Sequence, residues 1–128
     1  MLIKQLSVFL ENKTGRFTEV AAALKDAGIN MSAFTVSENS DFGIVRLIVS
    51  EPTAAYSALK KAGFAASLND VVCAHCDNKP GALSTLLNKL TAAGISIEYM
   101  YAFSIDDTSA QIVLKPNDMD KCIITLES

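Results

Sequence analysis

The stretch that decides the fold is Glu11–Phe17 (ENKTGRF), because it occurs twice. Asp77–Leu83 (DNKPGAL) repeats it at a spacing of 66 residues (77 − 11 = 66). At the same spacing the tripeptide Ala-Gly-Ile stands at 27–29 and again at 93–95. Matches at both ends of one segment, with apolar residues exchanged for apolar ones between them, indicate an internal duplication. We therefore expect two similar units in tandem, at residues 1–69 and 70–128.

The apolar pattern of the first unit predicts a strand, a helix, two strands, a helix and a strand. Leu6, Val8 and Leu10 alternate with other residues, as in a strand, and apolar residues from Phe17 to Ala27 then recur at helical spacing. Gly28 suits the left-handed end of that helix. Strands are expected at 29–37 and 42–50, joined by a hairpin turn at Asn39-Ser40-Asp41. A second helix is expected from Pro52 to Gly63, with Ala55, Ala58, Leu59 and Ala62 facing inward. A short strand at 64–69 completes the unit.

The second unit repeats this order but stops early. We expect strand 70–77, helix 81–93, and strands 95–104 and 109–115. Ser128 corresponds to Ala62 (128 − 66 = 62), so the second unit is expected to lack its last strand. Residues 122–125 are rich in β-branched side chains and fit either a helix or an extended segment.

The fold class that follows is α+β: two β-α-β-β-α-β units in tandem, each an antiparallel sheet with its helices on one face. Between the units, residues 64–77 must hold both the last strand of the first unit and the first strand of the second. We expect a bend at Asn69-Asp70, no flexible linker, and units packed tightly together.

Composition excludes several functional classes. The formal net charge is −3 and the pI is about 5.0, which argues against binding of nucleic acid through its phosphates. No apolar run approaches the roughly 20 residues that cross a bilayer, and the first residues do not resemble a signal peptide. Three cysteines are an odd number, which does not suggest paired disulfides. We expect a cytoplasmic protein with reduced thiols and no membrane association.

Residues suited to catalysis are scarce. His75 is the single histidine, it falls within an expected strand, and the acidic residues are scattered over turns and helix ends. Cys73 and Cys76 form a C-x-x-C pair, but residues three apart on a strand point to opposite faces, so their sulfurs diverge. We therefore expect no enzymatic activity, no metal and no cofactor.

The repeated polar turn is the favoured binding site. It leads from a strand into a helix N-terminus, where unpaired backbone N–H groups and the helix dipole favour a carboxylate. Glycine allows close backbone approach, and an asparagine amide both donates and accepts hydrogen bonds, which suits a zwitterionic ligand. The alternative is that asparagine and glycine only build the turn and cap the helix.

At these residues the sequence resembles the ACT domain family, small regulatory modules of the ferredoxin-like β-α-β-β-α-β order, and the resemblance covers essentially the whole chain. It implies a non-catalytic regulatory protein that holds a free amino acid at the interface of paired units, and a regulated amino-acid metabolic enzyme as partner. Thr14 departs from the family pattern, where proline is usual. The candidate ligand-binding residues carried over are Asn12, Gly15, Arg16, Phe17, Asn30 and Met31 in the first unit, and Asn78, Gly81, Ala82, Leu83, Ser96 and Ile97 in the second.

Two other hypotheses remain open. A dimerisation or partner module for an amino-acid biosynthetic enzyme would share the fold without a ligand of its own, and Tyr99, Tyr101 and Phe103 on one strand face could serve its interface. Core packing is the more common role for such a stripe. A ferredoxin-like RNA binder or metallochaperone is disfavoured by the acidic charge, the lack of an aromatic-basic RNA-binding pattern, and the strand position of the cysteine pair.

The missing last strand predicts a homodimer or larger assembly. A sheet edge without its neighbour presents N–H and C=O groups that are costly to bury unpaired. A strand from the first unit or from a second chain would satisfy them, unless Cys122–Leu126 replaces the strand within a monomer. Analytical ultracentrifugation at micromolar concentration tests the prediction, and a mass near 13.7 kDa with full thermal stability would contradict it.

Overall fold

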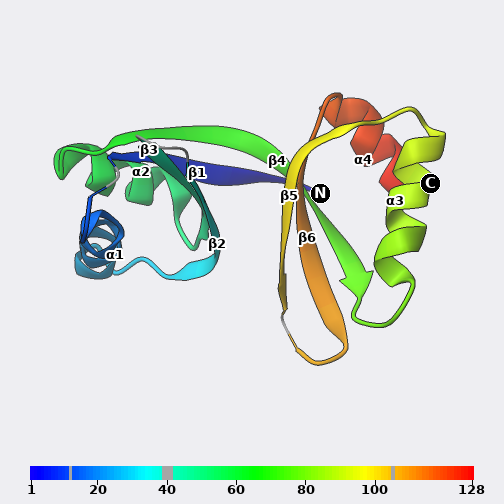
Figure 1. Cartoon of the computed structure of the whole chain (residues 1–128), viewed down its shortest axis with the longest axis horizontal. Helices are drawn as coiled ribbons and strands as arrows, with labels where there is room; N and C mark the ends of the chain where they lie inside the picture. The colour runs from blue at the N-terminus through cyan, green and yellow to red at the C-terminus, as the bar shows by residue number, and fades with distance from the viewer. Residues whose placement is uncertain (12, 39–41, 105) are drawn as a thin grey trace. The chain divides into compact units, whose positions relative to one another are not determined.

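The computed structural model describes residues 1–11, 13–38, 42–104 and 106–128 and confirms the α+β class (Figure 1). The hairpin turn expected at Asn39-Ser40-Asp41 lies outside the described residues. The elements are β1 (Leu2–Glu11), α1 (Arg16–Asp26), β2 (Met31–Glu38), β3 (Phe42–Val49), α2 (Pro52–Lys61), β4 (Ala65–Asp77), α3 (Ala82–Ala92), β5 (Ile97–Ser104), β6 (Ser109–Pro116) and α4 (Met119–Glu127). The strands follow the order β2-β3-β1-β4-β6-β5 in an antiparallel sheet.

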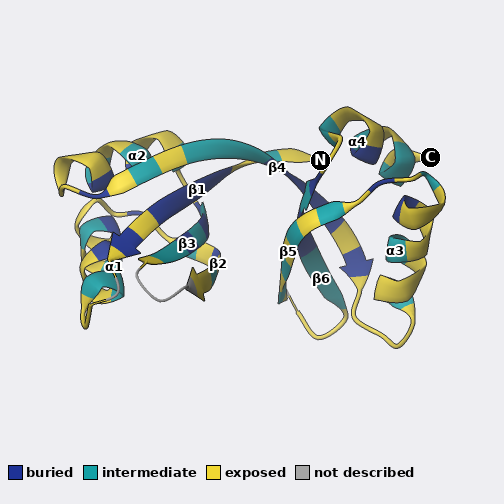
Figure 2. Cartoon of the chain, turned by 45° about the horizontal axis from the view of Figure 1, so that its top comes forward, coloured by how far each residue is buried: buried dark blue, intermediate teal, exposed yellow. Residues whose placement is uncertain are grey.

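The chain divides into two compact units by its internal contacts. One is Lys4–Asn69, called here the first unit; the other is Asp70–Ser128 together with Met1–Ile3, called the second unit. Buried residues concentrate on the strands and on one face of each helix (Figure 2). Each unit therefore has its own hydrophobic core.

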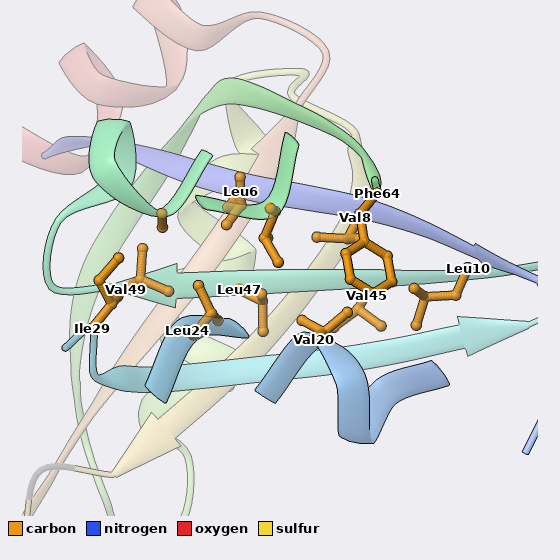
Figure 3. Packing of buried hydrophobic residues seen from close by; sticks show 12 residues of the cluster. Leu6, Val8, Leu10, Val20, Leu24, Ile29, Val45, Leu47, Val49 and Phe64 are labelled. Atoms are coloured by element: carbon orange, nitrogen blue, oxygen red, sulfur yellow. The ribbon is translucent and has the colours of Figure 1, made fainter. Parts of the chain in front are cut away.

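The core of the first unit lies between the sheet and helices α1 and α2. Leu6, Val8 and Leu10 of β1 are buried in it, as their alternation predicts. Val20 and Leu24 of α1 pack on them, and Figure 3 shows these side chains converging from the two layers. Ala27 and Ala62, expected to face inward, are exposed, because α1 ends at Asp26 and α2 at Lys61.

Strand β4 runs through Asn69 and Asp70 without the expected bend, which corrects that prediction. The Asn69 side chain, typical of turns, is instead held within the strand. Its Oδ1 accepts hydrogen bonds from Ser7 Oγ at 3.1 Å and from Gln5 Nε2 at 3.4 Å. These hydrogen bonds satisfy the polar side chain of Asn69 beside the buried Gln5. The strand can therefore stay extended at Asn69 without burying an unpaired polar group.

The segment that fitted either helix or strand is helical. Asp118 precedes α4, and its side chain accepts a hydrogen bond from the Lys121 N–H at 3.0 Å, a capping bond typical of helix starts. Cys122 is fully buried in the second core. Capping and burial thus outweigh the β-branched residues, and Cys122–Leu126 does not replace the missing strand.

Met1, the residue ahead of β1, pairs with β4. The Met1 amine donates to the Cys73 carbonyl at 3.1 Å, and the Cys73 N–H donates to the Met1 carbonyl at 2.7 Å. This pairing sets Met1 beside β4, on the side away from β6.

The two cores differ in how completely they cover equivalent leucines. Leu59 stands eight residues after the N-cap Glu51 of α2, and Leu126 eight after the N-cap Asp118 of α4 (59 − 51 = 8; 126 − 118 = 8). Leu59 is fully buried, whereas Leu126 is only half-buried. The first core is closed by Phe64 at the start of the last strand (Figure 3), a layer that the second core does not have in the described residues.

We predict that Leu59→Ala destabilises the protein far more than Leu126→Ala. Removing the fully buried side chain leaves a cavity and should cost about 3 kcal/mol. Removing the half-buried one should cost roughly 1 kcal/mol, because it already contacts water. Urea unfolding followed by circular dichroism measures both, and equal losses would contradict the difference between the cores.

Candidate functional site

The two repeated turns adopt the same conformation. Gly15 before α1 has φ of 86° and Gly81 before α3 has φ of 87°, and each is the N-cap of its helix. A Cβ added at either glycine would meet no atom within 4 Å. The positive φ alone therefore accounts for glycine at both positions, and no closely approaching group is needed to explain it.

The N-cap residues Gly15 and Gly81 have no side chain with which to cap these helices. Asn78 binds elsewhere: its N–H donates to the Thr108 carbonyl at 2.9 Å and its side-chain amide donates to the Asp107 carbonyl at 3.4 Å. It ties the second turn to the β5–β6 connection, a structural role for this asparagine. Asn12 lies outside the described residues. The first N–H of each helix donates to a carbonyl of its turn, Arg16 to Lys13 at 3.4 Å and Ala82 to Lys79 at 3.2 Å, and the dipole of each helix N-terminus favours an anion.

Arg16 gives the first turn a cation that the second lacks, since Ala82 takes its place. Its guanidinium contacts Glu19 at 2.8 Å and Glu11 at 3.7 Å, and it lies 5.6 Å from the centre of the Phe64 ring. The side chain is one-third exposed, and its Nε is buried without a hydrogen-bond partner in the described residues. The first residue of α1 therefore carries a positive group that is partly solvated, and its Nε has no hydrogen-bond partner in the described residues.

Glu11 balances part of this charge. The Lys13 ammonium lies 3.0 Å from its carboxylate. The hydrogen bond from Lys13, its positive charge and that of Arg16 hold the pKa of Glu11 below its ordinary value. In the second turn Asp77 and Lys79 occupy the matching places at a longer 3.8 Å. The first turn therefore carries the denser set of charges of both signs.

The apolar candidates of the turns play different roles. Phe17 packs edge to face on Phe34 of β2, with ring centres 5.6 Å apart, and also contacts the first core. Ala82 packs against the second core, while its neighbour Leu83 is exposed. Only Phe17 among them joins a turn to a second element through an aromatic pair in the described residues.

The remaining candidates lie at the opposite end of each helix from the turn. An eleven-residue helix such as α1 spans about 16 Å, which separates Gly15 from Asn30 and Met31. The Asn30 N–H donates to Ser50 Oγ at 3.1 Å, and the Ser96 N–H donates to Asn117 Oδ1 at 3.1 Å. Met31 and Ile97 pack against their own cores. A single unit therefore does not bring both halves of the candidate site together.

Sequence reasoning missed a groove in the second unit. It has a volume of about 640 Å³ and runs between the edge of β4 and helices α3 and α4. Its lining is Met1, Cys73, Ala74, His75, Cys76, Asp77, Lys79, Ala82, Thr85, Leu86, Lys89, Leu126 and Glu127.

The cysteines lie on different faces of the second sheet. The Cys73 thiol donates to Gln111 Oε1 at 3.3 Å, whereas Cys76 packs with Cys122 in the core under the helices. In the described ranges, no group of three His, Cys, Asp or Glu side chains could hold a metal ion. His75 is exposed and lies 3.5 Å from Asp77. Nor is any helix of the described chain long and apolar enough to cross a membrane.

We predict that Cys73 and Cys122 are alkylated more slowly in the folded protein than in urea. Burial raises the pKa of both thiols, which lowers the fraction of reactive thiolate, and also restricts access. Iodoacetamide labelling at pH 8 with mass-spectrometric readout measures the rates. Equal rates, or elemental analysis showing about one zinc or copper per chain at these cysteines, would contradict a structural role.

Comparison with solved structures finds a relative at 52% identity. Protein BT0572 from Bacteroides thetaiotaomicron superposes with a TM-score of 0.95, and the match covers 99% of this chain and 88% of that one. The regulatory subunit of aspartate kinase from Thermus thermophilus matches with a TM-score of 0.71 at 14% identity, covering 99% and 91% of the two chains. That from Thermus flavus gives a TM-score of 0.65 at 13% identity, covering 99% and 94%. The two regulatory subunits share the fold.

Comparison with curated protein sequences finds no match. The family model described as an ACT domain pair, however, matches residues 1–126. The duplication, the strand order and the paired glycine turns all fall within that match. The chain therefore belongs to the ACT domain family and consists of an ACT domain pair.

Proposed function

We propose that this protein is a non-catalytic regulatory protein that binds a free amino acid. The observation that carries the proposal is the first turn, where the N-terminus of α1 brings Arg16 together with two carboxylates. The ligand carboxylate would bind the N–H groups of α1 and the Arg16 guanidinium. Glu11 and Glu19 would attract its ammonium group. A zwitterion matches both sets of charges.

Family membership supports this role, because ACT domains are regulatory modules. The aspartate kinase neighbours are named regulatory subunits, which is consistent with a similar role here and with an amino-acid metabolic enzyme as partner. We place the protein in the cytoplasm, as such a partner requires. We further propose that Asn30 and Met31 contribute from a facing unit, since they lie about 16 Å from Gly15 in their own, and that Ser96 and Ile97 do the same for the second turn.

The alternative is a dimerisation or partner module without a ligand, and one observation favours it. Phe34 and Val36 of the edge strand β2 are 56% and 52% exposed. Apolar side chains exposed on an edge strand are suited to pairing with another chain. The two proposals differ in one measurable property, which is binding of a free amino acid.

We predict that one of the twenty amino acids at millimolar concentration raises the melting temperature. A ligand at a hundred times its Kd stabilises by about 2.7 kcal/mol. Arg16→Gln should weaken the affinity roughly 10- to 100-fold, because a charge-assisted hydrogen bond contributes about 1.5–3 kcal/mol. Calorimetric titration of the amino acid that gives the shift measures this loss.

Lys25→Gln is the matched control, because Lys25 carries the same charge at the other end of α1. Gly15→Val and Gly81→Val should also abolish binding, but they strain a backbone at positive φ and so need a folding check. If no amino acid shifts the transition, the partner-module proposal replaces this one. If both charge variants weaken binding equally, the site does not lie at the first turn.

A further inference from the structure

Beside the first turn, strand β2 keeps two large apolar side chains in contact with solvent. Phe34 is 56% exposed and Val36 is 52% exposed. They stand directly opposite Leu47 and Val45 of β3, which are fully buried in the first core. Residues directly opposite each other in an antiparallel pair share one face of the sheet. The apolar surface of the first core therefore continues past β3 and lies open at β2.

Phe17 joins this open surface to the turn. It is the second residue of α1, and its ring packs edge to face on that of Phe34, with the ring centres 5.6 Å apart. Arg16, the residue before it, carries the guanidinium that would bind the carboxylate of the proposed ligand. Cα atoms of consecutive residues are about 3.8 Å apart. The start of α1 therefore brings the charged groups of the turn next to an open apolar surface.

The second unit keeps the same two positions apolar. Leu83 stands 66 residues after Phe17, and Met100 stands 66 residues after Phe34 (83 − 17 = 66; 100 − 34 = 66). Leu83 and Met100 are each 39% exposed. Exposed positions accept polar side chains without loss of a core, so the fold itself does not require apolar residues there. Both copies of the turn therefore combine a helix start with apolar side chains that contact solvent.

We propose that the ligand is an amino acid with a large apolar side chain, aromatic or aliphatic, and that Phe34 is the residue that selects it. This inference rests on the proposed function and adds the chemical class of the ligand. The side chain of the ligand would cover the Phe34 ring and Val36, and this contact is favourable in proportion to the apolar area removed from water. A short side chain covers less of that area, and a charged one loses hydration against it.

Calorimetric titration of the full chain with single amino acids tests the class. Phenylalanine, leucine or isoleucine should bind at least about tenfold more tightly than alanine, serine, aspartate or lysine, because each buried methylene adds to the affinity. If serine, aspartate or lysine binds most tightly, this inference is overturned while the proposed function stands. If none of the twenty amino acids binds, the proposed function fails and this inference fails with it.

Phe34→Ala and Phe9→Ala form a matched pair of variants. Phe9 is 51% exposed and lies on the opposite face of the same sheet, since its neighbours Val8 and Leu10 are buried in the first core. The matching place in the second unit holds the polar His75 (75 − 9 = 66), so that face does not keep an apolar residue in both copies.

Phe34→Ala should weaken the binding of the preferred large amino acid roughly tenfold and that of alanine less than about twofold. Phe9→Ala should change neither affinity. A purely structural role of Phe34 would weaken both ligands alike, so equal losses overturn the inference, as do equal effects of the two variants. Analytical ultracentrifugation of Phe34→Ala gives a further check. A change of mass with an unchanged ligand preference would assign Phe34 to a protein interface and overturn the inference.

Discussion

The structure depends on the continuity of β4. Because this strand passes from Ala65 to Asp77 without a turn, its first residues belong to the first unit and its remainder to the second. An interruption would leave Asn69 without Ser7 and Gln5, and Cys73 without Met1. The segment that begins at Met1 is thus tied to β4 at Cys73 and again at Asn69.

Much of the fold could be predicted from the sequence, because it rests on local patterns. The alternation of Leu6, Val8 and Leu10 is set within one strand. The glycines at positive φ are each set by the local backbone of one turn. The bend at Asn69-Asp70 was predicted wrongly because turn propensity is a local preference, and here distant partners satisfy the asparagine. The helix at Cys122 shows the same limit, since burial and a capping aspartate outweigh β-branching.

The candidate site was predictable only in part. Its turns, glycines and helix starts follow from the repeat, whereas the contacts of Arg16 depend on Glu11, Glu19 and Phe64, which no spacing rule brings together. The duplicated motif suggested two equivalent sites, but side chains around the backbone turn make them different. Asn78 is taken up by the β5–β6 connection and Ala82 carries no charge. Duplication preserved the backbone and not the chemistry around it.

The pairing of Met1 with Cys73 has a consequence for how the protein is handled in the laboratory. Met1 opposes Cys73 in an antiparallel ladder, so each residue joined ahead of Met1 falls beside the next residue of β4, from Ala74 onward. The leader of an amino-terminal affinity tag would therefore extend β1 along the edge of β4 and cover Leu86 and Leu126.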